Sequence, residues 1–165
     1  MADTAHPNFL SRAAHCAALL FLCAGLFTLL GQPAVARMVQ EKLVLELAQG
    51  PREITVEVAE TPQDMAMGLM FRTSLAEDHG MLFPAPAPHE ANMWMRNTYI
   101  PLDMVFIRAD GVIHRIEPMT EPLSETIVAS KGLVLAVLEL AGGASARMGL
   151  KAGDRVRHRI FKSAP

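Results

Sequence analysis

Two apolar runs separated by Asp110-Gly111 are the feature that most constrains the fold of this chain. The run Leu102–Ile107 precedes the dipeptide and Val112–Glu117 follows it. Asp-Gly supplies the left-handed backbone that a tight hairpin turn requires, and the flanking runs supply two strands that can pair. The sequence therefore predicts an antiparallel β hairpin over residues 102–117.

Further short apolar runs extend this prediction to the rest of the chain. The other predicted strands cover residues 43–48, 54–58, 133–140 and 154–161, and the predicted helices cover 62–70 and 144–148. Gly50-Pro51 is expected to form a turn, and the Pro-Ala-Pro-Ala-Pro stretch at 84–88 an extended loop, because proline cannot donate ladder hydrogen bonds. Short strands with few helices predict a mainly β fold, either a sandwich or a flattened barrel.

The first 36 residues are expected to be a signal peptide. Arg12 and His15 precede an apolar run, Cys16–Leu30, and Ala34-Val35-Ala36 follows it with the small-x-small pattern of a cleavage site. The run is shorter than the ~20 residues of a membrane-spanning helix, so an uncleaved anchor is the lesser alternative. The sequence thus predicts one β domain over residues 37–165, in the periplasm or secreted.

Composition excludes several classes of chemistry in that mature domain. Both cysteines of the chain, Cys16 and Cys23, lie in the expected signal peptide, so neither a disulfide nor thiol catalysis is available. The formal net charge of -2 lacks the basic excess of a nucleic-acid binder. There is no phosphate loop, dinucleotide fingerprint or G-x-S-x-G motif, and no cofactor is expected.

Two acidic residues interrupt runs of large aliphatic side chains. In a strand, Asp103 shares one face with Val105 and Ile107, and Glu139 lies within the aliphatic run 137–140. A buried carboxylate needs a partner, so Asp103 either pairs with an arginine, caps the turn after Pro101, or faces a ligand pocket. If both acids faced one cavity, they could act as the acid and base of a hydrolase.

Trp94 is the only tryptophan, and it allows a core or a pocket interpretation. An indole offers a large apolar face and one donor, which suits a small-molecule or sugar site, and Asn97 beside it adds an amide. Methionines also crowd this third of the mature chain: Met65, Met67, Met70, Met81, Met93 and Met95. Thioethers select Cu(I), although filling a core is the commoner use of methionine.

Several ordered blocks of this sequence resemble one known family, Domain of Unknown Function 192. The blocks are residues 68–72, 80–83, 93–107, 123–126 and 137–140, and the resemblance runs from about Ile54 to about Val156. It implies a compact, mainly β domain, specifically a jelly-roll-like β sandwich, with no established reaction. It also marks Arg72, Arg96 and Glu125, which lie in matched blocks, as candidate site residues.

These observations together predict an exported domain that binds an unidentified small molecule or envelope glycan. The expected ligand-binding residues are Arg72, Trp94, Arg96, Asn97, Asp103, Glu125 and Glu139. One alternative is a carboxylate-dependent hydrolase that uses Asp103 and Glu139. The other is a periplasmic Cu(I)-binding protein that uses Met93, Met95 and a histidine.

Overall fold

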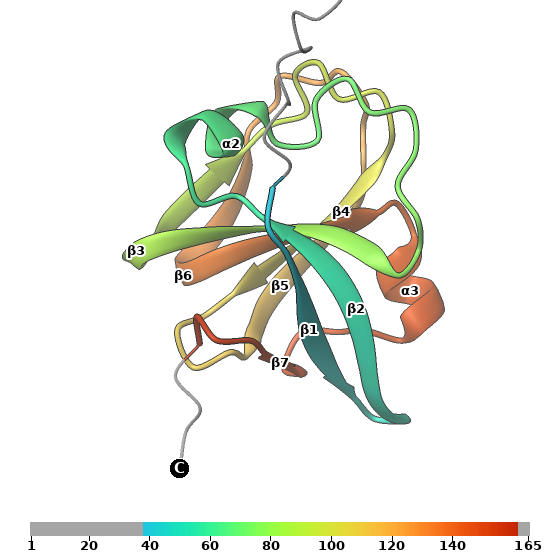
Figure 1. The fold of residues 1–165 in the computed structure, drawn as a ribbon, viewed down its shortest axis with the longest axis vertical. Coiled ribbons are helices and arrows are strands. Elements are labelled where there is room, and N and C mark those ends of the chain that lie inside the picture. Colours follow the sequence, from blue (N-terminus) through green and yellow to red (C-terminus); the bar gives the residue numbers. More distant parts are fainter. Residues whose placement is uncertain (1–37, 162–165) are drawn as a thin grey trace, which may run out of the picture. The chain divides into compact units, whose positions relative to one another are not determined.

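The computed structural model describes residues 38–161, and the expected signal peptide lies outside them. The described part is mainly β, as predicted, with two short helices (Figure 1). Its elements are β1 (Gln40–Leu47), β2 (Gly50–Val58), α2 (Pro62–Met67), β3 (His79–Met93), β4 (Leu102–Ile107), β5 (Ile113–Thr120), β6 (Val128–Ala141), α3 (Ala144–Met148) and β7 (Arg155–Arg157). None of the helices in this part of the chain is long and apolar enough to cross a membrane.

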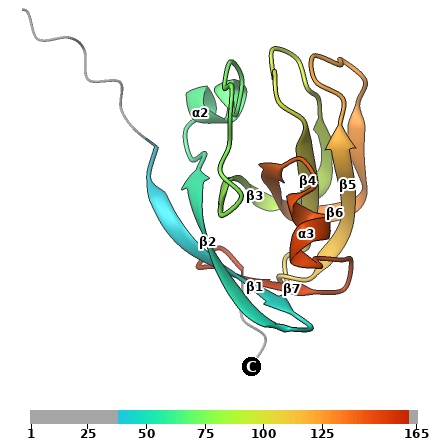
Figure 2. The same cartoon turned by 90° about the vertical axis from the view of Figure 1, so that its right-hand side faces the viewer.

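The seven strands form one sheet in the order β5-β4-β6-β3-β2-β1-β7. All neighbouring pairs are antiparallel except β2 and β3. The sheet curls, and a bridge between Val112 and Arg155 joins its two edges. The predicted sandwich or flattened barrel is therefore realised as a single curled, barrel-like sheet (Figure 2).

The two faces of the sheet bury two separate groups of apolar side chains. The first group fills the inside of the curl and includes Leu45, Val56 and Leu138. The second covers the opposite face of the central strands, and Met81 and Met104 lie at its centre. All six residues of β4 are buried, as expected for a strand that is covered on both faces.

Local sequence signals account for most element boundaries. The predicted hairpin is confirmed as β4 and β5, and Gly111 in its turn has a left-handed φ of 79°. The N-cap of α2 is Thr61, whose hydroxyl accepts a hydrogen bond from the backbone N–H of Asp64. Gly149 ends α3 with a left-handed φ of 69°.

Several predicted boundaries were wrong, among them the end of the first helix, which lies at Met67 instead of Met70. The first turn lies at residues 48–49, because Gly50 already pairs with Leu47. The proline-rich stretch 84–88 is part of β3 instead of a loop, and its missing N–H groups coincide with a register shift against β6 between Pro84 and His89. The last strand ends at Arg157, before the predicted end at residue 161.

Candidate functional site

Three loops lie at the end of the described unit opposite the β1–β2 turn, and the first of them follows α2 directly (Figure 1 and Figure 2). They cover residues 68–78, 94–101 and 121–127. The backbone N–H of Phe71 donates to the carbonyl of Asn97 at 2.9 Å, and that of Leu123 donates to the carbonyl of Thr98 at 3.0 Å. The loop 94–101 is thus bonded to its neighbours on both sides.

A pocket of about 130 Å³ opens between α2, the loop 94–101 and the outer face of the sheet. A cavity of roughly 150 Å³ admits benzene, so this pocket has room for a single ring or a small head group. Its wall is formed by Met65, Ala66, Met67, Gly68, Leu69, Met70, Phe83, Asn92, Met93, Trp94, Arg96, Thr98 and Glu139. The wall is mostly apolar with a few polar groups, which is the usual character of ligand pockets.

Glu139 supplies the buried ionisable group of this pocket. The residue is only 4% exposed, and no described residue donates a hydrogen bond to its carboxyl group or forms an ion pair with it. Burial alone raises the pKa of Glu139 to about 8. The side chain is therefore mainly protonated at neutral pH, and it carries a stability cost that the fold does not offset.

Glu139 lacks the ion-pair partner that the other glutamates in its row of the sheet have. Strand pairing places Glu57, Met81, Glu139, Met104 and Glu117 in one row on the same face of β2, β3, β6, β4 and β5. The two outer glutamates have arginine partners, whereas Glu139 lies between two methionines that are both 0% exposed. Its surroundings do not supply the cation that the other two acids have.

Trp94 and Arg96 form the rim of the pocket. The guanidinium of Arg96 lies 5.0 Å from the centre of the Trp94 ring, within cation–π range. Trp94 is 47% exposed, so the pocket interpretation of this residue is supported over the core interpretation. The indole is positioned to report on anything that enters.

Asp103 does not take part in this pocket. It is 0% exposed and accepts four hydrogen bonds, from the N–H of Met119 (2.9 Å), Gly143 (2.8 Å) and Ser145 (2.8 Å) and from the Ser145 hydroxyl (2.5 Å). Burial opposes ionisation, but the hydrogen bonds from Ser145, Met119 and Gly143 outweigh it and lower the pKa of Asp103. The expectations of an arginine partner and of a ligand-facing carboxylate are both corrected: Asp103 anchors the start of α3.

The two acids of the hydrolase alternative lie on opposite faces of the sheet. Asp103 pairs with Leu140 across β4 and β6, whereas Glu139 pairs with Met104. Because successive side chains on a strand point to opposite faces, the sheet itself separates the two carboxyl groups. They do not share a cavity, so the structure excludes them as an acid–base pair.

The remaining candidate residues do not line the pocket. Arg72 forms a bidentate ion pair with Glu57, with oxygen–nitrogen distances of 2.7 and 2.5 Å, and this bond raises the pKa of Arg72. Asn97 is exposed, with its amide nitrogen 3.9 Å from the sulfur of Met70. Glu125 is exposed in the loop before β6. Of the seven candidates, the pocket brings together Trp94, Arg96 and Glu139.

Core packing explains only some of the clustered methionines. Met81 and Met95 are buried, and the Met95 sulfur accepts a hydrogen bond from the hydroxyl of Thr120. By contrast, Met65 and Met67 are 42% and 44% exposed on α2, a helix with no buried residue. Met65, Met67, Met70 and Met93 all line the pocket. The copper alternative named Met93 and Met95, but only Met93 belongs to this wall.

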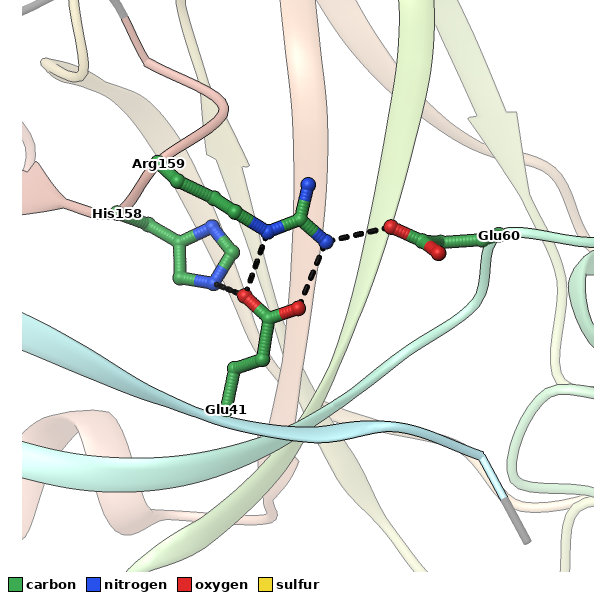
Figure 3. Close-up of polar contacts among 4 residues, drawn as sticks. All are labelled: Glu41, Glu60, His158 and Arg159. Atoms are coloured by element: carbon green, nitrogen blue, oxygen red, sulfur yellow. Dashed lines mark hydrogen bonds and ion pairs between the residues drawn. The ribbon is translucent and has the colours of Figure 1, made fainter.

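A second polar cluster lies away from the pocket, where the end of the described chain meets β1 (Figure 3). Arg159 forms a bidentate pair with Glu41 at 2.8 and 2.7 Å and also bonds Glu60 at 2.5 Å. His158 places Nε2 2.9 Å from Glu41, although the atoms are not aligned for a hydrogen bond. Burial lowers the pKa of His158 despite the nearby carboxylate. This cluster joins segments of the chain that are distant in sequence.

Several residues that line the pocket were not predicted as site residues, and for some of them the sequence contained a usable signal. Leu69 and Thr98 reach the pocket from two loops, and Phe83 and Asn92 reach it from β3, an arrangement that no local pattern shows. Met65 and Met67 had a usable signal, since two residues that are two positions apart on a short helix point in different directions, so at least one of them lies away from the buried side. Apolar residues at such positions indicate an exposed or ligand-facing surface.

The chain matches both a known protein family and solved structures. Residues 43–158 match DUF192, described as "Uncharacterized ACR". A protein from Sinorhizobium meliloti 1021, provisionally named as a transcription regulator, is 41% identical over 76% of this chain and 98% of its own, with a TM-score of 0.73. A protein of unknown function from Novosphingobium aromaticivorans DSM 12444 is 38% identical over 77% of this chain and 90% of its own, with a TM-score of 0.72.

No curated protein matches the chain. The family match covers most of the described residues and includes every candidate site residue named above. On this evidence, the chain belongs to the DUF192 family.

Proposed function

We propose that this protein is an exported domain that binds a small molecule in the pocket between α2 and β6. The observation that carries the proposal is Glu139, a buried carboxyl group without a partner among the described residues that opens on a pocket wall. Proteins seldom keep such a group unless it is satisfied or used, and strongly shifted pKa values gather at functional sites.

The pocket suits a small molecule better than an envelope glycan. Its volume of about 130 Å³ is that of a single ring, and the guanidinium of Arg96 already lies over the ring of Trp94, where a sugar would stack. The Sinorhizobium protein is named as a transcription regulator, and a nucleic-acid-binding role does not fit an exported domain with a net charge of -2.

Trp94 provides a direct test, since it is the only tryptophan of the chain. The mature protein is screened against a library of small metabolites and soluble glycan fragments by ligand-observed NMR. Hits are then titrated while the Trp94 fluorescence is recorded. We expect small-molecule hits that change this fluorescence with a single saturable site.

A matched pair of variants shows whether the hits use the pocket. Trp94→Ala removes part of the pocket wall, whereas Tyr99→Ala removes an aromatic ring that is equally exposed, at 50%, and does not line it. Binding should weaken at least tenfold in the first variant and stay unchanged in the second. Hits that bind Trp94→Ala as well as wild type would refute this site.

Export is part of the proposal and is tested separately. Cleavage after Ala34-Val35-Ala36 predicts a mature chain that begins at Arg37 or within a residue or two. N-terminal sequencing of protein recovered from the cell envelope checks this start. Full-length protein in the membrane fraction would contradict it.

A further inference from the structure

The character of the pocket wall indicates the charge of its ligand. Four methionines, Met65, Met67, Met70 and Met93, line the pocket together with the aromatic residues Trp94 and Phe83. Sulfur lone pairs and ring faces are electron-rich, and neither offers a strong hydrogen-bond donor. Such a wall interacts best with a soft or apolar positive charge.

Glu139 completes this arrangement. Each of the other two glutamates in its row has an arginine partner on the protein: Arg72 pairs with Glu57 and Arg115 with Glu117. A carboxylate that leaves water needs a positive partner close by, and here the described residues provide none. The missing partner is a cation of the size that the pocket can hold.

We infer that the pocket binds a singly charged cation and that Glu139 gives up its proton when the cation enters. The exchange is balanced: the neutral carboxyl group and the incoming cation become a carboxylate–cation pair and one released proton. This inference rests on the proposed function and adds the chemical class of the ligand. Two sources share this chemistry, an alkylammonium head group and Cu(I), for which methionine is a suitable ligand.

The other charged groups near Glu139 do not replace such a partner. Arg96 is exposed at the rim and contributes a positive charge that solvent screens. On the β2 side Glu57 is already paired with Arg72, and on the β5 side Glu117 is already paired with Arg115. Because Arg96 repels a cation, Arg96→Gln should strengthen binding modestly, by about twofold.

The test measures proton release directly. The mature protein is titrated at pH 7 by calorimetry in phosphate and in Tris, whose different ionisation enthalpies reveal protons that are released on binding. The probes are choline, its uncharged carbon isostere dimethylbutanol, and Cu(I) supplied anaerobically with a competing chelator. We expect choline or Cu(I) to bind with the release of nearly one proton, and dimethylbutanol to bind at least tenfold more weakly.

Variants separate the roles of the carboxyl group and the sulfurs. Glu139→Gln, with its fold checked by circular dichroism, should abolish proton release and weaken cation binding at least tenfold. The double change of Met65 and Met67 to leucine keeps the apolar wall, so it should weaken Cu(I) binding and leave choline binding unchanged. The probe that the wild-type protein binds identifies the source of the cation, and the double variant shows whether the sulfurs take part in binding it.

Two outcomes would overturn the inference. If dimethylbutanol binds as tightly as choline without proton release, the pocket binds small molecules but is not a cation site, and the proposed function stands alone. If none of the three probes binds, the cation assignment fails. The proposed function is then judged independently by the metabolite screen and by the Trp94→Ala and Tyr99→Ala pair.

Discussion

At the scale of single residues, Asp103 and Glu139 show how surroundings decide what a buried carboxyl group does. Both interrupt aliphatic runs, and both are almost completely buried. Burial acts on Asp103 too, but hydrogen bonds to its charged form outweigh it and lower its pKa, whereas nothing offsets the burial of Glu139. One acid therefore serves as an ionised structural anchor and the other remains neutral at a pocket.

Asp103→Asn tests the structural anchor. The amide nitrogen of asparagine would face donors that now bond a carboxylate oxygen, so we expect a loss of about 2–4 kcal/mol in the free energy of unfolding. Urea denaturation of the mature domain measures this loss, and Asp78→Asn, at an exposed aspartate, is the control that should leave the midpoint unchanged. A change within about 0.5 kcal/mol at Asp103 would show that its hydrogen bonds contribute little to stability.

Glu139→Gln tests the cost of the neutral carboxyl group in the ligand-free protein. Its pKa is about 8 in the folded chain against 4.5 as the ordinary value, so between these pH values the folded state holds a proton that the unfolded state lacks. Stability should therefore fall as pH rises through this window, by about 1.4 kcal/mol per pH unit at most.

The difference in unfolding free energy between Glu139→Gln and wild type reports on Glu139 alone, because the histidines, which also titrate in this pH range, contribute equally to both proteins. We expect Glu139→Gln and wild type to be similar near pH 5 and the variant to be more stable by several kcal/mol above pH 8. Urea unfolding from pH 5 to 9 measures the difference, and Glu125→Gln at an exposed position should follow wild type. Parallel curves for Glu139→Gln and wild type would mean that Glu139 is already ionised or satisfied.

At the scale of elements, several loop residues other than glycine adopt a positive φ, a backbone conformation that their side chains disfavour. Of the five described non-glycine residues with positive φ, Phe71 and Asn97 lie in loops beside the pocket, and Met119 and Leu123 lie at or just beyond the end of β5. Phe71, Met119 and Leu123 are bulky, apolar and exposed. Such a conformation costs about 1–3 kcal/mol per residue and persists only where the surrounding structure enforces it.

Replacement by glycine tests this strain, with a matched control in the same loop. Leu123 has φ 63° and is 57% exposed, whereas Ile127 is 52% exposed and has no positive φ. We expect Leu123→Gly to leave the unfolding free energy within about 0.5 kcal/mol or to raise it, and Ile127→Gly to lower it by about 1 kcal/mol. Equal losses in urea denaturation would show that Leu123 is not strained.

Elements that depend on a short local sequence signal could be predicted from the sequence. Elements that depend on pairing with a segment distant in sequence could not. Asp110-Gly111 fixes its hairpin within a few residues, so that prediction was confirmed. The prolines at 84–88 indicated a loop, yet pairing with β6 on either side of the register shift keeps them in β3. The expected last strand gives way to a turn at residues 159–160, where Arg159 pairs with Glu41 and Glu60, both distant in sequence.

At the scale of the whole molecule, the residues of the site also divide into those that local sequence signals could predict and those that depend on distant pairing. The family, the mainly β fold and three residues that line the pocket, Trp94, Arg96 and Glu139, could be predicted, the fold from short apolar runs and the three residues from the blocks that resemble the family. The placement of Asp103 and Glu139 on opposite faces of the sheet could not be predicted, since it depends on the strand register that places Leu140 opposite Asp103. A shift by one residue would exchange their faces.

The curled sheet closes where the β4–β5 turn meets β7, and Gly111 lies at that contact. The N–H of Val156 donates to the carbonyl of Gly111 at 2.8 Å, and the N–H of Ile113 donates to the carbonyl of Asp154 at 2.9 Å. A Cβ on Gly111 would lie 2.6 Å from the carbonyl oxygen of Val156, whereas one on Gly153 would meet nothing within 4 Å. Both glycines have positive φ, 79° and 95°, so alanine strains the backbone at each, but only at Gly111 does it obstruct the closure.

We therefore expect Gly153→Ala to cost about 1 kcal/mol of stability and Gly111→Ala to cost a further 1–3 kcal/mol, the range for forcing extra atoms into a packed contact. Urea denaturation gives both values. Amide hydrogen exchange then locates the effect: in Gly111→Ala the amides of Ile113 and Val156 should exchange faster, while that of Leu138 in β6 should keep its protection relative to global unfolding. Equal losses in the two variants would mean that the closing contact adds little, and that the sheet is held in its curled form by the apolar side chains inside it.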